Sequence, residues 1–276
     1  MSSISQEIKT SDYDFLMRDA ITMMKRADCR FSDYRVGAAL LTESGNIISG
    51  CNVETWPIGG GRCAERVADE KAVSKAYKRD YTAVAVASID GMATPCGSCR
   101  QQLVQANRNM VVITVNQLGA KINEFVLRDL LPTLSELPNR FEQGLPMGIE
   151  GTILAACQAR DSAYVPYSRA SFGAAVLTES GAVYSGTTVD AANYSSSVNA
   201  VQAACAAALT ANEKTFQAVV FTSNDGEIVP DGSSLQMINE FTPNVTVIMT
   251  DRQGVVTASV ALSTLLPHAF GPKNLQ

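Results

Sequence analysis

The sequence predicts an α/β protein in which one fold is built twice. Segments with strand patterns alternate with segments of helical spacing, which is the element order of the α/β class. Residues 36–54 match residues 172–190 at a constant offset of 136, with eleven of nineteen positions identical, where average composition would give roughly one or two. The 276 residues exceed the usual size of one domain and suit two domains of about 130–140 residues.

The order of elements in the first half follows from apolar spacing and turn residues. We expect a helix at residues 11–29, a hairpin of two strands at 36–42 and 47–53, and a loop at 55–61. A helix at 63–78, a strand at 83–89, a helix at 96–106 and a strand at 110–115 are expected to follow. Proline and glycine recur between residues 132 and 151, which is typical of a linker. We therefore predict a first domain at 1–135, a linker at 136–150 and a second domain at 151–276.

Composition excludes several classes of function. The net charge is −5 and the basic residues form no stripe, which argues against a nucleic acid as partner. No apolar run approaches the ~20 residues of a membrane span. Seven cysteines, three of them in a metal pattern, fit a reducing compartment, so we expect a cytoplasmic protein. The single histidine, His268, excludes a Ser-His-Asp triad or a histidine-rich metal site within one chain.

Three cysteines have the spacing of a metal site. Cys63 is followed some thirty residues later by Cys96 and Cys99, which form a Pro-Cys-x-x-Cys motif. Three thiolates occupy three corners of a zinc tetrahedron and leave the fourth for water, which is the catalytic form of such a site. Glu65, two residues after Cys63, is placed to move a proton to and from that water.

Two other interpretations of these residues stay open from the spacing alone. Glu65 could simply be an acidic residue at a helix N-terminus, where negative charge is favoured. The three cysteines could belong to a closed structural zinc site with Cys51 or Cys29 as the fourth ligand.

Three thiolates on one dication leave a net negative charge that must be offset. Both cysteine segments precede helical runs, so positive helix ends would face the metal and favour thiolate. Arg66, next to Glu65, could add a full positive charge by donating to the sulfurs. We expect it to tune the charge of the site.

The second copy lacks every residue of this pattern. The repeat, allowing one deletion, aligns Cys63, Glu65, Cys96 and Cys99 with Asn199, Val201, Asp231 and Ser234. We therefore expect one Zn²⁺ per chain, in the first domain only, and a degenerate second domain that carries out no reaction. Cys157 and Cys205 do not lie at ligand positions and are expected to be buried small hydrophobes.

The chain resembles the cytidine deaminase family over nearly its whole length. Cys-x-Glu with Pro-Cys-x-x-Cys is the signature of zinc nucleobase deaminases, and the segments that carry the resemblance are residues 31–41, 50–54, 63–66, 95–101, 129–132 and 265–275. The resemblance implies two tandem deaminase-like domains, each a mixed five-stranded sheet with helices on both faces. Double-domain members of the family are dimers in which each chain has one catalytic and one inactive domain, so a homodimer is expected.

The resemblance also implies which residues hold a nucleoside. Asn52 and Glu54 would hold the ribose hydroxyls, unless they are only polar residues at the end of a strand. The backbone N–H of Ala64 would meet the pyrimidine O2, and Glu65 the ring N3. Tyr34 occupies a base-pocket position but could equally be core. Phe270 could reach a neighbouring subunit's site or anchor the C-terminus in its own domain.

The expected reaction is hydrolytic deamination of cytidine or deoxycytidine to the uridine nucleoside with release of ammonia, as in pyrimidine salvage. The loop at 55–62 departs from the family and contains the only tryptophan, Trp56, and a triple glycine. It motivates one alternative, a modified cytosine nucleoside of the blasticidin S type. A further alternative is a non-catalytic structural zinc or scaffold protein, which an ammonia-release assay distinguishes.

Overall fold

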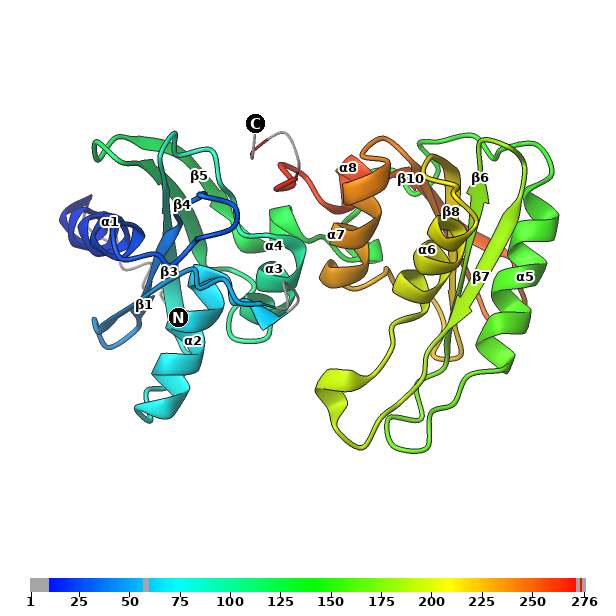
Figure 1. Ribbon diagram of the computed structural model, residues 1–276, viewed down its shortest axis with the longest axis horizontal. Coiled ribbons are helices and arrows are strands. Elements are labelled where there is room, and N and C mark those ends of the chain that lie inside the picture. The colour runs from blue at the N-terminus through cyan, green and yellow to red at the C-terminus, as the bar shows by residue number, and fades with distance from the viewer. Residues whose placement is uncertain (1–9, 57–59, 272–273, 275–276) are drawn as a thin grey trace, which may run out of the picture. The chain divides into compact units, whose positions relative to one another are not determined.

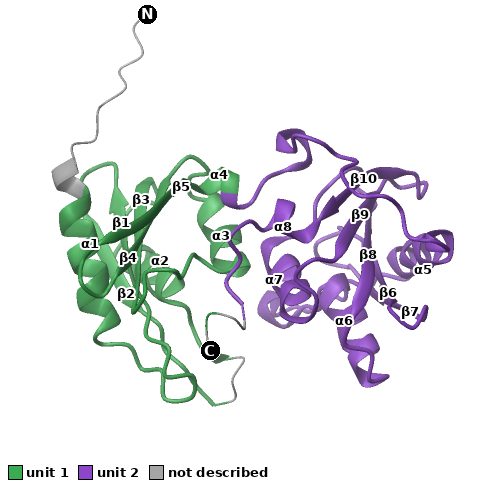
Figure 2. Cartoon of the chain, turned by 90° about the horizontal axis from the view of Figure 1, so that it is seen from above, with its two compact units in different colours: residues 1–129, 272–276 green, residues 130–271 purple. Residues whose placement is uncertain are grey.

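The computed structural model describes residues 10–56, 60–271 and 274. The chain forms two compact units, one built mainly from the residues up to Asp129 and the other from Leu130–Gly271 (Figure 2). Gly59 of the triple glycine and most of the polar N-terminal stretch lie outside the described residues.

The first unit is one mixed sheet with helices on both faces. Its elements are α1 (Thr10–Met24), β1 (Gly37–Thr42), β2 (Ile47–Cys51), α2 (Ala64–Ser74), β3 (Tyr81–Ser88), α3 (Gly97–Val104), β4 (Val111–Asn116), β5 (Lys121–Val126) and α4 (Leu127–Leu130). The strand order is β2-β1-β3-β4-β5. Only β3 and β4 are parallel, and the other neighbours are antiparallel.

Alternation along the strands assigns the two faces of this sheet. Ala39 and Leu41 of β1 pack with Leu16, Ala20 and Met24 of α1 in a buried cluster. The helices α2 and α3 cover the opposite face (Figure 1). The expectation of a mixed five-stranded sheet with helices on both faces is confirmed. Both metal-pattern segments therefore begin helices on the same face.

Several boundaries differ from the expectation. The first helix ends at Met24 and not at residue 29, the second ends at Ser74 and not at residue 78, and the strand expected at residue 83 begins at Tyr81. The edge strand β5 has no counterpart among the elements expected from spacing, because most of its side chains are exposed or half-buried and it lacks a clear apolar alternation.

The second unit repeats the first. Its elements are η2 (Leu134–Glu136), α5 (Ile149–Asp161), β6 (Phe172–Thr178), β7 (Val183–Thr187), η3 (Tyr194–Ser196), α6 (Ala200–Thr210), β8 (Phe216–Ser223), α7 (Gly232–Phe241), β9 (Thr246–Thr250), β10 (Val256–Ala261) and α8 (Leu262–Leu265). The strand order β10-β9-β8-β6-β7, with β8 and β9 parallel, is that of the first sheet. Helix α5 packs on one face, and α6 and α7 cover the other (Figure 1).

The repeat extends to single hydrogen bonds. The N–H of Glu54 donates to the carbonyl of Asp28, and the N–H of Asp190 donates to that of Tyr164, both at 2.7 Å. Both pairs keep the offset of 136. The segment before α5 is tied to its own unit, since Ser259 of β10 donates to the carbonyl of Arg140 at 2.6 Å.

Among the described residues, no helix combines the length and the apolar character that crossing a bilayer requires.

Candidate active site

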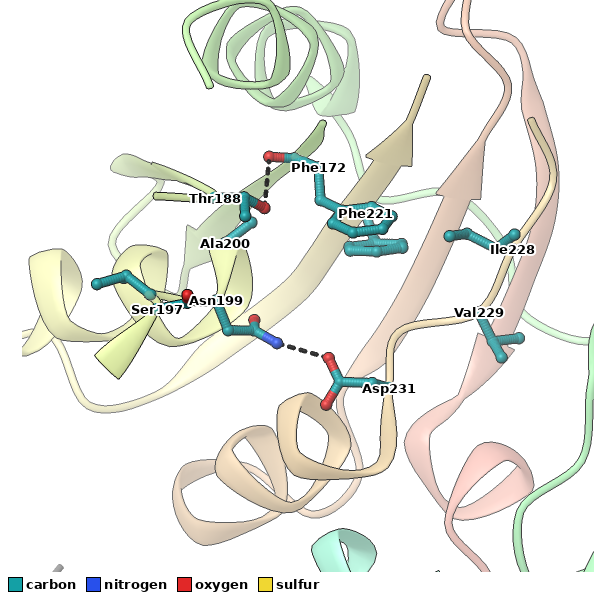
Figure 3. Close-up of a pocket in the computed structure, with 10 residues that line it drawn as sticks. Phe172, Thr188, Ser197, Asn199, Ala200, Phe221, Ile228, Val229 and Asp231 are labelled. Atoms are coloured by element: carbon teal, nitrogen blue, oxygen red, sulfur yellow. Dashed lines mark hydrogen bonds between the residues drawn. The ribbon is translucent and has the colours of Figure 1, made fainter. Parts of the chain in front are cut away.

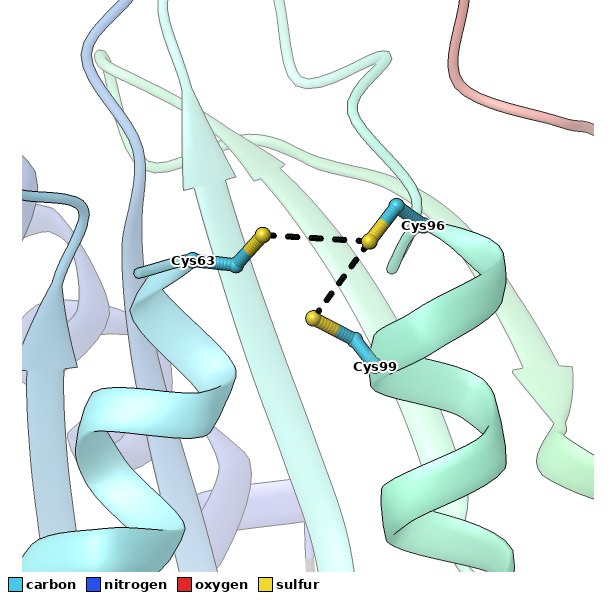
Figure 4. A group of neighbouring side chains, drawn as sticks. All are labelled: Cys63, Cys96 and Cys99. Atoms are coloured by element: carbon cyan, nitrogen blue, oxygen red, sulfur yellow. Dashed lines mark hydrogen bonds between the residues drawn. The ribbon is translucent and has the colours of Figure 1, made fainter. Parts of the chain in front are cut away.

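Three sulfur atoms converge at the start of two helices (Figure 4). Cys63 is the N-cap of α2, Cys96 is the N-cap of α3, and Cys99 lies in the first turn of α3. The Sγ atom of Cys96 is 3.7 Å from that of Cys63 and 3.6 Å from that of Cys99. Tetrahedral ligands about 2.3 Å from zinc lie ~3.8 Å from one another. The three free thiols therefore fit three corners of a zinc site.

A fourth protein ligand is not found in the described part of the chain. The cluster of metal-ligating side chains there contains Cys63, Cys96 and Cys99 only. Cys51 instead directs its thiol to the carbonyl of Arg26 at 3.6 Å. The closed site with a fourth cysteine therefore has no support among these residues, and the open form is the one that fits.

The environment of the sulfurs favours one thiolate first. Hydrogen bonds from Cys63 and Cys99, together with the backbone N–H groups of Ser98 and Cys99, hold the pKa of Cys96 well below its ordinary value. Hydrogen bonding within the cluster and burial raise the pKa of Cys63 and Cys99. A dication is the natural partner that would stabilise the remaining thiolates.

Glu65 lies beside this cluster. It is the second residue of α2, and only 4% of it is exposed. Burial and the negative charge of Cys96 raise its pKa to about 7, against the opposing effects of its own backbone N–H, of Cys99 and of Arg66. A carboxyl group with this pKa can accept and return a proton at neutral pH. Such burial differs from the usual solvated acid at a helix N-terminus.

The site contains a second arginine, Arg100, which the sequence analysis did not assign. Arg100, directly after Cys99, is fully buried. Its Nε donates to the carbonyl of Pro95 at 2.7 Å and its Nη2 to Oγ1 of Thr94 at 3.0 Å. Burial lowers its pKa to about 10, and the negative groups around it limit that drop. It therefore keeps a full positive charge at neutral pH, and its place after the last cysteine was the available signal.

Arg66, the residue expected to balance the thiolates, is partly buried. Its Nε is buried without a hydrogen-bond partner among the described residues. The expected donation to the sulfurs stays a prediction.

The residues expected to hold the sugar bind the loop before β1. Oδ1 of Asn52 accepts from the N–H of Val36 at 2.8 Å, and its Nδ2 donates to the carbonyl of Tyr34 at 2.9 Å. The Glu54 carboxylate accepts from the N–H of Phe31 at 2.8 Å and from the N–H and hydroxyl of Ser32. These side chains are thus already oriented by the protein.

The remaining expected residues lie in different settings. Burial raises the pKa of Tyr34, which is half-buried. Trp56 is 78% exposed, with its ring 6.2 Å from that of Phe31. The carbonyl of Phe270 accepts from Gln236 and Asn239 of α7, which anchors the tail within its own unit. A role of Phe270 in a neighbouring subunit stays a prediction.

The second unit has a cavity of about 270 Å³ at the corresponding place (Figure 3). Asn199 caps α6 where Cys63 precedes α2, and Asp231 caps α7 where Cys96 precedes α3. Their side chains are joined by a hydrogen bond of 2.5 Å. Phe172 and Phe221 stack in its wall at 5.7 Å between ring centroids. A hydrogen-bonded pair thus stands where the first unit has sulfurs.

Comparison with known proteins finds deaminases. Two models described as "Cytidine and deoxycytidylate deaminase zinc-binding region" match residues 10–115 and 104–223. A cytidine deaminase of Halalkalibacterium halodurans is 36% identical over 122 residues, 44% of this chain and 92% of that protein. A cytidine deaminase of Serratia proteamaculans is 30% identical over 187 residues, 63% of this chain and 60% of that protein. The crystal structure of cytidine deaminase from Burkholderia pseudomallei aligns with 43% of this chain and 94% of its own, with a TM-score of 0.41 and 34% identity.

Proposed function

Because this chain belongs to the cytidine and deoxycytidylate deaminase family, we propose that it deaminates cytidine or deoxycytidine hydrolytically. Water and the nucleoside give the uridine nucleoside and ammonia. The observation that carries this function is the set of three sulfurs at tetrahedral spacing with the buried Glu65 beside them. The comparisons favour neither the modified cytosine nucleoside nor the non-catalytic scaffold.

The residues of the first unit divide the work. Cys63, Cys96 and Cys99 would hold zinc, which when bound acts as a Lewis acid and lowers the pKa of water. Glu65 takes one proton from the attacking water and gives it to ring N3, and then takes the second proton of that water, now on the C4 hydroxyl group, and gives it to the departing amine. Burial raises the pKa of this carboxyl group, which favours its taking up a proton.

The substrate would be held by groups that the fold has already oriented. Asn52 and Glu54 would bind the ribose hydroxyls, the N–H of Ala64 the pyrimidine O2, and Tyr34 would line the base pocket. Because hydrogen bonds to the protein backbone hold Asn52 and Glu54 in place, little side-chain freedom would be lost on binding.

We extend the proposal to the whole chain. The catalytic domain would span residues 1–135, and residues 151–276 would form a degenerate domain without zinc. The internal pairing of Asn199 with Asp231, which leaves no thiolate there, supports one zinc per chain. We further propose that the protein is a homodimer in which Phe270 completes a neighbouring site. A cytoplasmic location and a role in pyrimidine salvage belong to the same proposal.

The test is release of ammonia and formation of uridine from cytidine by zinc-loaded protein. Glu65→Gln should keep one zinc per chain and lower kcat by about 10²- to 10⁴-fold, since it removes the proton carrier. Glu70→Gln, at an exposed position of the same helix, is the matched control and should keep full activity. Substantial turnover by Glu65→Gln would contradict the assignment.

A further inference from the structure

Helix α2, which begins after Cys63, carries a buried carboxylate further along its length. Asp69 of α2 is 2% exposed. It accepts four hydrogen bonds, from Arg79 Nε at 2.9 Å, Arg79 Nη2 at 2.8 Å, the Tyr81 hydroxyl at 2.7 Å and Gln102 Nε2 at 2.6 Å. The donors come from the segment after α2, from β3 and from α3. One side chain therefore connects three parts of the first unit.

This connection joins the two helices that carry the sulfurs. Asp69 is six residues after Cys63, and Gln102 is six residues after Cys96. With a helical rise of about 1.5 Å per residue, the hydrogen bond lies about 9 Å along each helix from its cysteine N-cap. Arg79 adds a second link, because its Nη2 also donates to the carbonyl of Gln102 at 3.2 Å.

The second unit provides an internal comparison. The repeat places Cys205 at the position of Asp69 and Met237 at that of Gln102. Strand register places Phe216 at the position of Tyr81, since Thr42 pairs with Tyr81 and Thr178 with Phe216. Cys205 and Phe216 are fully buried, and burial alone raises the pKa of Cys205 to about 12. The copy without sulfur ligands thus has apolar side chains at the positions of Asp69, Tyr81 and Gln102.

The two kinds of contact differ in what they specify. Apolar side chains of similar volume tolerate small shifts and repacking. Hydrogen bonds to a charged group have preferred directions and lengths, and the planar guanidinium adds a fixed fork. A metal site needs its ligands held within about 0.5 Å, which is a demand that only the first unit has to meet.

We propose that Asp69, Arg79, Tyr81 and Gln102 form a positioning network that sets α2 against α3 so that Cys63 can share one zinc with Cys96 and Cys99. This proposal rests on the proposed zinc site but not on its reaction. Asp69 and Gln102 are positioning residues, and neither is expected to touch substrate.

The test compares zinc release from purified protein to an excess of chelator at pH 7. Gln102→Met installs the residue of the second copy and should speed zinc release by about 10-fold, the factor that corresponds to roughly 1.4 kcal/mol, close to the energy of one hydrogen bond to a charged group. Gln105→Met, at an exposed position just past the end of α3, is the control and should release zinc at the original rate. In the cobalt-substituted protein, the visible absorption bands should shift for Gln102→Met only.

Asp69→Asn provides a second variant. If Asp69→Asn fails to fold, Gln102→Met still tests the proposal, because it leaves Asp69 with three of its four hydrogen bonds. Unchanged zinc release and an unchanged cobalt spectrum in Gln102→Met, with lowered stability, would overturn the proposal and leave the network a packing role. Altered zinc release in a protein that deaminates no cytidine would support the network and overturn the proposed function.

Discussion

The side-chain amide of Asn199 donates to the carboxylate of Asp231 across the starts of α6 and α7, where the first unit presents Cys63 and Cys96. Asp231 also accepts from the backbone N–H and hydroxyl groups of the two serines that follow in α7. The carboxylate is thus satisfied within the protein. The pair connects the same two helix starts that a metal would connect, but it does so without leaving a coordination position.

Asp231→Ala should destabilise the second unit by about 2 kcal/mol, because it removes a helix cap and leaves Asn199 without its acceptor. The zinc content should not change. Chemical denaturation, with hydrogen exchange of the α6 and α7 amides, measures the loss of stability. Metal analysis measures the zinc content. Ser180→Ala, which removes the hydroxyl that pairs with Glu213 and Thr178 at a turn of the same unit, should cost less than Asp231→Ala, by about 1 kcal/mol or more. Loss of zinc from Asp231→Ala would refute this division of roles.

Glu54→Gln should raise KM for cytidine by about 10- to 100-fold with little change in kcat, since a hydrogen bond from the sugar to a charged group would be lost. Asp190 makes the corresponding loop contacts in the second unit. Asp190→Asn is therefore the matched control, and it should lower stability without changing KM. If Glu54→Gln only lowers stability, by as much as Asp190→Asn does, Glu54 serves the loop alone.

Asp69 should make stability depend on acid. Burial by itself raises its pKa, but the hydrogen bonds from Arg79, Gln102 and Tyr81 outweigh burial and lower it. Because the pKa of Asp69 is lower in the folded state, its carboxylate stabilises the fold at pH values above its unfolded-state pKa of about 3.9. This stabilisation is lost as the pH falls further. The difference in unfolding free energy between the original protein and Asp69→Asn should therefore be constant from pH 7 to 5 and shrink below about pH 4. Urea titrations across this range measure it, and a difference that grows in acid would contradict the assignment.

Gly37→Ala should cost at least about 3 kcal/mol of unfolding free energy. A Cβ atom there would overlap the carbonyl oxygen of Ala20 and the backbone nitrogen of Met24, and these helix atoms cannot move aside as a side chain can. Gly173 has the same setting in the second unit, so its substitution should behave alike. Gly151→Ala in α5 meets nothing within 4 Å and should be neutral or stabilise by up to about 1 kcal/mol. Thermal denaturation of the three variants checks the ranking.

Much of the site follows from sequence, and the misses have physical reasons. The cysteines and Glu65 stand at short spacings around helix starts, so local pattern suffices to find them. Arg100 was not assigned because its place after Cys99, the one available signal, does not show that the side chain will be fully buried. Local pattern does not single out Asp69, since its hydrogen-bond donors Arg79, Tyr81 and Gln102 lie further along the chain.

The sequence by itself determined the set of three cysteines, the duplication of the fold and the absence of these cysteines from the corresponding positions of the second copy. These depend on which side chains are present and on spacings within single helices. Only the tertiary structure decided that Cys63 comes within 3.7 Å of Cys96, 33 residues away, that Asp69 meets Gln102, and that Asn199 pairs with Asp231. The physical reason is that the pairing of distant strands in each sheet places the helices, and no local pattern encodes the distance between two helices.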